Sequence, residues 1–170
     1  ARRLVFTYRS RSRDQQLERS CSPLRLTFYR SNWYLAAWCH QSEELRVFSV
    51  DRIDKPRISG EPAFEPPADT IAAELDSSYG IFTGRADRTA VLKFDALAAR
   101  WVGEEEWHPG AKAEPQADGG VVLRIPYKHD TELVMDVLRH GVHCEVLAPP
   151  ELRKTVAAAL ATAAQQYRTR

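Results

Sequence analysis

The sequence predicts an α+β fold: a small closed β-barrel followed by a ferredoxin-like βαββαβ domain with an extra C-terminal helix. Three observations support this prediction. Short alternating runs separated by polar turns fill residues 1–55, a proline-rich segment with one short helical pattern covers residues 56–88, and strand and helix patterns alternate over residues 89–170. These ranges are the barrel, the linker and the ferredoxin-like domain that we expect.

The barrel is predicted from four or five short strands joined by tight turns. The first strand covers Leu4–Ser10, where side chains alternate between two faces. A second strand spans about Glu18–Tyr29, and Pro23 within it marks an edge position or a bulge. The residues expected to point inward from this second strand are Leu24, Leu26 and Phe28.

A β-hairpin follows, and it is the clearest local pattern in the chain. Trp33–His40 and Leu45–Ile53 are rich in aromatic and β-branched residues, and they flank the polar turn Gln41–Glu44. In the second strand, a period of two places Arg46 and Arg52 on one face. That face also carries Phe48 and Val50.

Two interpretations of these arginines remain open. They extend past the rim of the sheet into solvent, or they converge on a concave site that holds an anion. Guanidinium suits the second role because its planar fork donates two parallel hydrogen bonds to phosphate or carboxylate. Tyr34, on the neighbouring strand, would add an aromatic face and a hydroxyl.

The remaining elements follow from capping residues, turn residues and periodicity. Pro56, Pro62, Pro66 and Pro67 mark the linker, and a short helix is expected over Asp69–Leu75. The later elements are, in order, a strand at Ala90–Phe94, a helix at Asp95–Val102 capped by Asp95, a hairpin of Ala111–Gln116 with Val121–Tyr127, a helix at Asp130–Arg139, a strand at Val142–Leu147 and a helix at Glu151–Tyr167.

Charge is distributed unevenly along the chain. The net charge is +1, but residues 1–60 carry eleven Arg and one Lys against six Asp and Glu, whereas residues 61–170 carry twelve basic and seventeen acidic residues. The basic first third either contacts a polyanion or is complemented by the acidic remainder, within one chain or across a dimer.

Composition sets further limits. No apolar run approaches the roughly 20 residues that a membrane helix needs. The three widely spaced cysteines favour unpaired thiols and a cytoplasmic protein. Because the chain begins Ala-Arg-Arg without an initiator methionine, we expect a fragment of a longer protein.

The sequence contains no pattern typical of catalysis. It has no glycine-rich phosphate loop, no nucleophile elbow and no Cys–His pair with an orienting partner. The densest His and Cys group is His140, His143 and Cys144, which straddles a helix end and a strand start, so these side chains should diverge. We therefore expect neither an enzyme, nor a metal site, nor a cofactor.

Two motifs resemble a known family. Asn32-Trp33-Tyr34-Leu35, with the Arg-x-Phe-x-x-Asp-Arg-Ile pattern of residues 46–53, resembles the WYL domain of bacterial transcription regulators. Residues 141–153 resemble the C-terminal extension that commonly follows WYL domains. The resemblance implies an Sm-like, SH3-type barrel that senses a nucleic-acid or nucleotide ligand. It also implies that Tyr34, Arg46 and Arg52 contribute to the ligand site.

In such regulators an N-terminal winged helix-turn-helix binds promoter DNA. No such motif precedes this barrel, so the resemblance implies the sensor half of a regulator, which would reach promoter DNA only through the absent domain. The candidate ligand-binding residues share a position on the predicted barrel and a side chain suited to phosphate or base contact. They are Tyr8, Arg9, Ser10, Arg30, Trp33, Tyr34, His40, Arg46, Phe48 and Arg52. Core packing remains an alternative for Tyr8 and Trp33, and a rim position for His40.

We hypothesise that single-stranded DNA is the effector and that it activates DNA binding in a DNA-damage response. The alternatives are a small anionic nucleotide messenger, such as a cyclic oligonucleotide, and an Sm-like RNA-binding module. We also expect a homodimer through the C-terminal region, because the alanine-rich final helix permits close packing. No membrane partner is expected.

Overall fold

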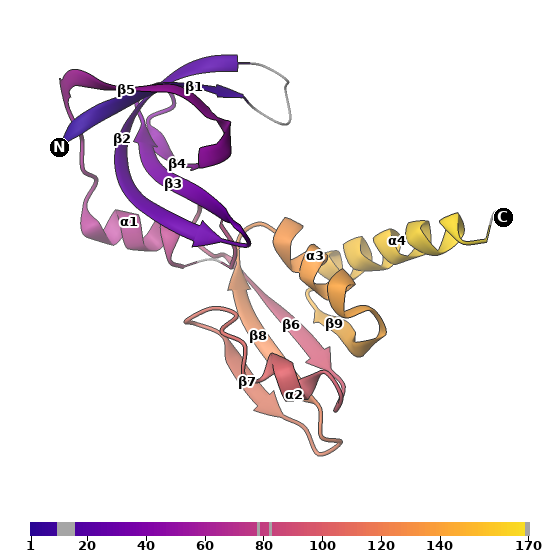
Figure 1. Ribbon diagram of the computed structural model, residues 1–170. Coiled ribbons are helices and arrows are strands. Elements are labelled where there is room, and N and C mark those ends of the chain that lie inside the picture. The colour runs from indigo at the N-terminus through magenta and orange to yellow at the C-terminus, as the bar shows by residue number, and fades with distance from the viewer. Residues whose placement is uncertain (10–15, 78, 82, 169–170) are drawn as a thin grey trace. The chain divides into compact units, whose positions relative to one another are not determined.

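The computed structural model describes residues 1–9, 16–77, 79–81 and 83–168 (Figure 1). The chain divides into two compact units. Unit 1 comprises Ala1–Asp76 with Ile81–Thr83, and unit 2 comprises Ser77–Gly80 with Gly84–Arg170. Each unit contains one antiparallel sheet, so the α+β prediction is confirmed.

Unit 1 is built on a five-stranded sheet with the order β4-β3-β2-β1-β5. The strands are β1 (Arg2–Arg9), β2 (Gln16–Tyr29), β3 (Asn32–Cys39), β4 (Glu44–Ser49) and β5 (Ile53–Pro62). A 3-10 turn, η1 (Val50–Arg52), separates β4 from β5. Among the described residues β5 pairs with β1 and not with β4, so the predicted closed barrel is not found.

The β2–β3 hairpin has a two-residue loop, Arg30–Ser31. Both residues have positive φ angles, 45° and 69°, and the flanking Tyr29 and Asn32 are paired. Positive φ at both loop positions is the mark of a type I′ turn, whose twist matches that of the strands it joins. The register of β2 shifts between Pro23 and Arg25, which confirms the predicted irregularity at Pro23.

The predicted linker was placed too early in the chain. Pro56 and Gly60 lie inside β5, which pairs with β1 as far as Pro62. Proline is tolerated there because β5 is an edge strand and Pro56 lies at the register shift between the pairs Thr7–Asp54 and Val5–Arg57. Both β5 and α1 (Ala68–Leu75) belong to unit 1, so the predicted boundary at residue 56 falls inside this unit, whereas α1 forms close to its expected position.

The core of unit 1 also differs from the prediction. Leu26 and Phe28 were expected to point inward, but they are 61% and 60% exposed. The core consists of Phe6, Cys21, Leu35, Ala37, Cys39 and Phe48. Strand β2 is fourteen residues long, and its C-terminal part extends beyond the core residues. Leu26 and Phe28 therefore lie on the core-facing side of the sheet but remain exposed.

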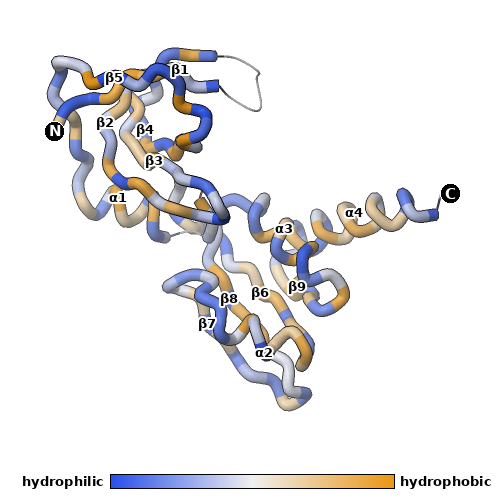
Figure 2. Tube along the Cα trace, in the orientation of Figure 1, coloured by the Kyte–Doolittle hydropathy of each residue, from blue (hydrophilic) through white to orange (hydrophobic). Residues whose placement is uncertain are grey.

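Unit 2 contains a four-stranded sheet with the order β7-β8-β6-β9. Its elements are β6 (Arg88–Phe94), α2 (Ala99–Val102), β7 (Lys112–Pro115), β8 (Val121–Tyr127), α3 (Thr131–His140), the 3-10 turn η2 (Gly141–His143), β9 (Cys144–Ala148) and α4 (Pro150–Gln166). Strand β8 is predominantly hydrophobic (Figure 2), in keeping with its place inside the sheet. The Asp95 carboxylate accepts hydrogen bonds from the N–H groups of Leu97 and Ala98, at 3.1 and 2.9 Å, as expected of a cap.

We expect Phe48→Ala to destabilise unit 1. Phe48 is 3% exposed, and its ring packs edge-to-face on Phe6 and Tyr8, at centroid distances of 5.2 and 5.0 Å. Truncation should lower the free energy of unfolding by about 3–5 kcal/mol, measured by urea denaturation. Ile58→Ala, at a site in the same unit that is 76% exposed, should change it by less than about 0.5 kcal/mol. Similar losses for the two variants would contradict this packing.

Candidate functional site

A cavity of about 520 Å³ opens in unit 1 beside η1. It is lined by Thr7, Arg9, Gln16, Asp51, Arg52, Ile53 and Asp54. Strand pairing brings these segments together, because Thr7 on β1 pairs with Asp54 and Arg9 pairs with Gln16 at the start of β2. The site therefore combines the end of β1, the start of β2 and the turn that leads from β4 into β5.

Arg52 is positioned by an aromatic ring. Its guanidinium carbon lies 5.7 Å from the centroid of the Tyr8 ring, within the range of a cation–π interaction. Tyr8 is held in turn by Phe48 and by the Ser49 N–H, which donates to the Tyr8 hydroxyl oxygen at 3.2 Å. Among the described residues, neither Arg52 nor Arg9 forms a salt bridge with a carboxylate, so both guanidinium groups retain donors for a ligand.

Two carboxylates line the same cavity, so its formal charges balance. Asp51 accepts hydrogen bonds from the Asn32 amide nitrogen, at 3.1 Å, and from the Ser49 hydroxyl. Asp54 is exposed. The cavity thus offers cationic donors and anionic acceptors together. A ligand that carries both a phosphate and amino or imino donors would match this arrangement better than a simple anion would.

The predicted convergence of Arg46 and Arg52 is not found. The alternation along β4 ends at Ser49, because Val50–Arg52 form a 3-10 turn in place of a continued strand. Arg46 is ion-paired with Glu44, its Nε donates to the Ser42 hydroxyl at 2.9 Å, and it does not line the cavity.

The other predicted residues have different surroundings. Phe48 is buried in the core, and Tyr34 is half-buried with its ring 6.5 Å from that of Tyr29. Trp33 is 51% exposed beside Phe28, and Arg30 lies over the Tyr29 ring at 5.3 Å. Ser10 falls outside the described residues.

The structure thus brings together Tyr8, Arg9 and Arg52 from the predicted set. Sequence reasoning missed Thr7, Gln16, Asp51 and Asp54. Asp51 is the aspartate of the Arg-x-Phe-x-x-Asp-Arg-Ile pattern, and Asp54 follows that pattern directly; these positions were the signal that could have found them.

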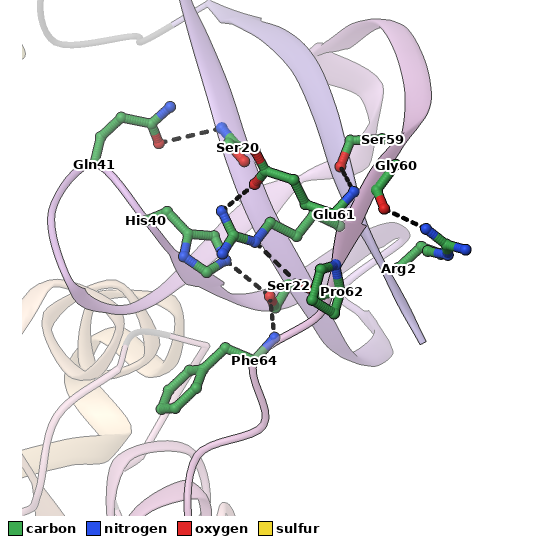
Figure 3. A network of polar contacts seen from close by, with 11 residues as sticks. Arg2, Ser20, Ser22, His40, Gln41, Ser59, Gly60, Glu61, Pro62 and Phe64 are labelled. Atoms are coloured by element: carbon green, nitrogen blue, oxygen red, sulfur yellow. Dashed lines mark hydrogen bonds and ion pairs between the residues drawn. The ribbon is translucent and has the colours of Figure 1, made fainter.

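His40 belongs to a polar network that joins three strands (Figure 3). Its Nε2 lies 2.9 Å from the Ser22 hydroxyl, which also accepts a hydrogen bond from the Phe64 N–H at 2.8 Å. Nearby, Arg3 pairs with Glu61 and donates from Nε to the Pro62 carbonyl at 3.1 Å. These contacts fasten the end of β5 to β1, and the residues that follow β3 and β5 to β2. His40 does not line the cavity, and in this arrangement it has a structural role.

Protonation of His40 would disturb this network. Ser22 is fully buried and already accepts from Phe64, so both side chains are satisfied when Ser22 donates its proton to a neutral His40. Burial, and secondarily the positive charge of Arg3, holds the pKa of His40 below its usual value of 6.5.

The His and Cys residues near the end of α3 diverge. The His140 ring packs 5.1 Å from that of Phe94, and the His143 Nδ1 lies 2.7 Å from an Asp95 carboxylate oxygen. Burial raises the pKa of the Cys144 thiol to about 12. The described part of the chain contains no group of three or more potential metal ligands. Within it, no helix has the length and apolar character needed to span a membrane.

Comparison with protein families identifies both regions. Residues 1–58 match the WYL domain, and residues 86–164 match the WCX domain. A WYL domain match followed by a WCX domain match supports the sensor region of a WYL-domain bacterial transcription regulator.

Among individual proteins, the chain is similar to Protein PafC. It is 29% identical over 167 residues to PafC of Mycobacterium tuberculosis (strain ATCC 25618 / H37Rv), covering 98% of this chain and 51% of that protein. It is 30% identical over 165 residues to PafC of Mycobacterium leprae (strain TN), covering 96% and 49%. The chain thus spans about half the length of these curated relatives.

Two solved structures are also similar. The proteasome accessory factor B/C (PafBC) of Arthrobacter aurescens is 29% identical, with a TM-score of 0.44, and the match covers 98% of this chain and 25% of that one. A CRISPR Cas-related protein is 10% identical, with a TM-score of 0.60 and coverage of 98% and 48%. This second likeness concerns the fold alone.

The His40 network predicts a pH-dependent stability. Because the folded-state pKa of His40 is lowered, the unfolded chain takes up its proton first as the pH falls, and the stabilising contribution is lost below about pH 6.5. We expect the melting temperature to fall between pH 7 and pH 5, and to fall less steeply in His40→Gln, whose amide oxygen still accepts from Ser22. Parallel curves for the two proteins would contradict this role.

Proposed function

We propose that this chain is the ligand-sensing region of a transcription regulator and that the cavity at Arg9 and Arg52 binds a nucleic-acid strand. The observation that carries the proposal is the pair of guanidinium groups that line one cavity without a carboxylate salt bridge among the described residues, with Arg52 placed over Tyr8. The basic character of residues 1–60 supports it, because excess positive charge attracts a polyanion. We propose single-stranded DNA as the ligand.

The energetics are consistent with specific binding. A hydrogen bond between a guanidinium group and phosphate contributes about 1.5–3 kcal/mol. Two such contacts with one stacked base, worth about 1–3 kcal/mol, would give micromolar affinity once the cost of association is subtracted. Affinity should fall with salt, with a slope of roughly −0.7 per phosphate neutralised.

The cavity carboxylates suggest how a base would be accommodated. Asp54 and Gln16 provide acceptors beside the two arginines. The amino and imino groups of a base are hydrogen-bond donors, so a nucleotide could place its phosphate at Arg52 and its base edge toward Asp54. This arrangement would offset the repulsion between Asp54 and the phosphate.

We further propose that ligand binding activates a DNA-binding domain elsewhere in the full-length protein, in the cytoplasm and in response to DNA damage. The family resemblance supports this role, which involves no catalysis. On the fold, we propose that unit 1 is an opened Sm-like barrel and unit 2 a ferredoxin-like sandwich. The order β7-β8-β6-β9, with helices after β6 and β8, supports the second assignment.

A small anionic nucleotide, such as a cyclic oligonucleotide, is the second candidate ligand. The cavity volume of about 520 Å³ favours it, because pockets for small ligands typically measure about 300–1,000 Å³. A ligand of this class would fill the cavity and gain nothing from further nucleotides.

We also propose that the protein forms a homodimer through α4. Of its seventeen residues only Leu152 and Val156 are buried, whereas Leu160 is 45% exposed. The helix is rich in alanine, which lets a partner helix approach closely.

Arg52→Ala should weaken binding of a labelled single-stranded oligonucleotide by roughly 10- to 100-fold, because it removes a guanidinium–phosphate contact. Fluorescence anisotropy at low salt measures this effect. Arg57→Ala is the matched control: it removes the same charge from the same sheet, but Arg57 is exposed and paired with Glu18 at 3.0 Å. It should lower affinity less than about threefold.

Several outcomes would contradict the proposal. Absence of binding by the unmodified protein at low salt would refute it. A larger loss in Arg46→Ala than in Arg52→Ala would move the site away from the cavity. Affinity that stays constant beyond two or three nucleotides would favour the small-nucleotide candidate, and equal affinity for RNA and DNA would favour an RNA-binding module.

Light scattering tests the dimer. The unmodified chain should have twice the mass of one chain, and Leu160→Glu should shift it toward the monomer, because the substitution would bury a charge in the interface. A monomeric mass for the unmodified protein at high concentration would refute the proposed dimer.

A further inference from the structure

Two exposed aromatic rings lie at the end of the β2–β3 hairpin. Phe28 and Trp33, here called the hairpin aromatic pair, are 60% and 51% exposed. They stand directly opposite each other on adjacent strands, and their ring centroids are 5.3 Å apart. Rings of this size usually contribute to a core, so their joint exposure on one face calls for an explanation.

The hairpin holds this pair in a rigid setting. The two-residue turn Arg30–Ser31 fixes the strand register, and Tyr29 and Tyr34 pack on the opposite face of the same strands. Leu26, 61% exposed, continues the apolar surface on the side of the pair. A preorganised ring loses little conformational entropy when a ligand stacks on it.

The start of β3, next to the hairpin aromatic pair, is connected to the cavity by hydrogen bonds of Asn32. Asn32 precedes Trp33, and its amide nitrogen donates to the Ser49 hydroxyl at 2.6 Å and to the Asp51 carboxylate at 3.1 Å. Asp51 lines the cavity that also contains Arg9 and Arg52. Asn32 therefore links the wall of the cavity to the strand that carries Trp33, from the face of that strand opposite to the Trp33 ring.

We propose that the hairpin aromatic pair is a base-stacking subsite for the strand whose phosphate occupies the cavity. This inference rests on the proposed function and extends it. Every nucleic-acid base has a π face that stacks on an exposed ring, whereas its phosphates require cations. The occupant is a single-stranded nucleic acid because such a strand presents both kinds of group in series. An apolar protein partner would cover the rings but would leave the guanidinium groups of the cavity unused.

The subsite implies a minimum length for the ligand. A strand that uses both the cavity and the hairpin aromatic pair carries at least one base beyond the nucleotide in the cavity. A longer strand therefore binds more tightly than a mononucleotide, and the gain depends on its bases and not only on its phosphates.

The test compares an ordinary oligonucleotide with an abasic one of equal length and charge. Phe28→Leu and Trp33→Leu keep an apolar side chain but remove the ring. Each should weaken binding of the ordinary strand by roughly 5- to 100-fold and leave binding of the abasic strand unchanged. Trp33→Phe, which keeps a ring, should retain most of the affinity. Trp101→Leu, at a site in unit 2 that is 58% exposed, is the matched control and should bind both strands normally.

The failures are distinguishable. If the unmodified protein binds neither strand, the proposed function itself fails. If it binds but the hairpin variants bind the ordinary strand as tightly, or lose affinity equally for both strands, the subsite is overturned while the cavity remains. If the hairpin variants instead change the mass measured by light scattering, the pair is an interface between copies of the chain, which also overturns the subsite.

Discussion

The packing of Phe48 against Phe6 and Tyr8 is the constraint on which the candidate site depends. These three rings meet edge-to-face where β1 and β4 face each other across the core of unit 1. Tyr8 can support Arg52 only because Phe48 and the Ser49 N–H fix its ring and hydroxyl. The position of the cation therefore derives from an apolar cluster and not from a salt bridge.

Polar contacts fix the strand ends around this cluster. Asn32 ties the β2–β3 hairpin to Ser49 and Asp51, and Ser22 ties His40 to Phe64. Both contacts link segments far apart in sequence, so each closes a loop whose entropy cost has to be offset by the packing beside it. The Asn32 contact lies beside the cavity, and the Ser22 contact holds Phe64, just after the C-terminal end of β5.

The arginines of the WYL motif are divided by the turn that follows β4. Arg46 remains on a regular strand, where it pairs with Glu44, while Arg52 is turned toward Tyr8 and the cavity. Residues of one short sequence motif therefore need not contribute to the same site. The balance of two arginines and two aspartates in the cavity favours a ligand with donors and acceptors over a bare anion.

The sequence by itself determined the features that depend on neighbouring residues. The hairpins, the cap at Asp95, the irregularity at Pro23 and the alternation of strands and helices in unit 2 all follow from local propensity and turn chemistry. The motif around Trp33–Leu35 likewise indicated the family. Only the tertiary structure decided that Pro56 lies in a strand, that Arg46 and Arg52 separate, that Phe28 and Trp33 remain exposed, and that Asp51 and Asp54 face the same cavity as Arg9. Each of these depends on which strands pair and where the core ends, and strand pairing is a non-local choice that alternation along one strand does not specify.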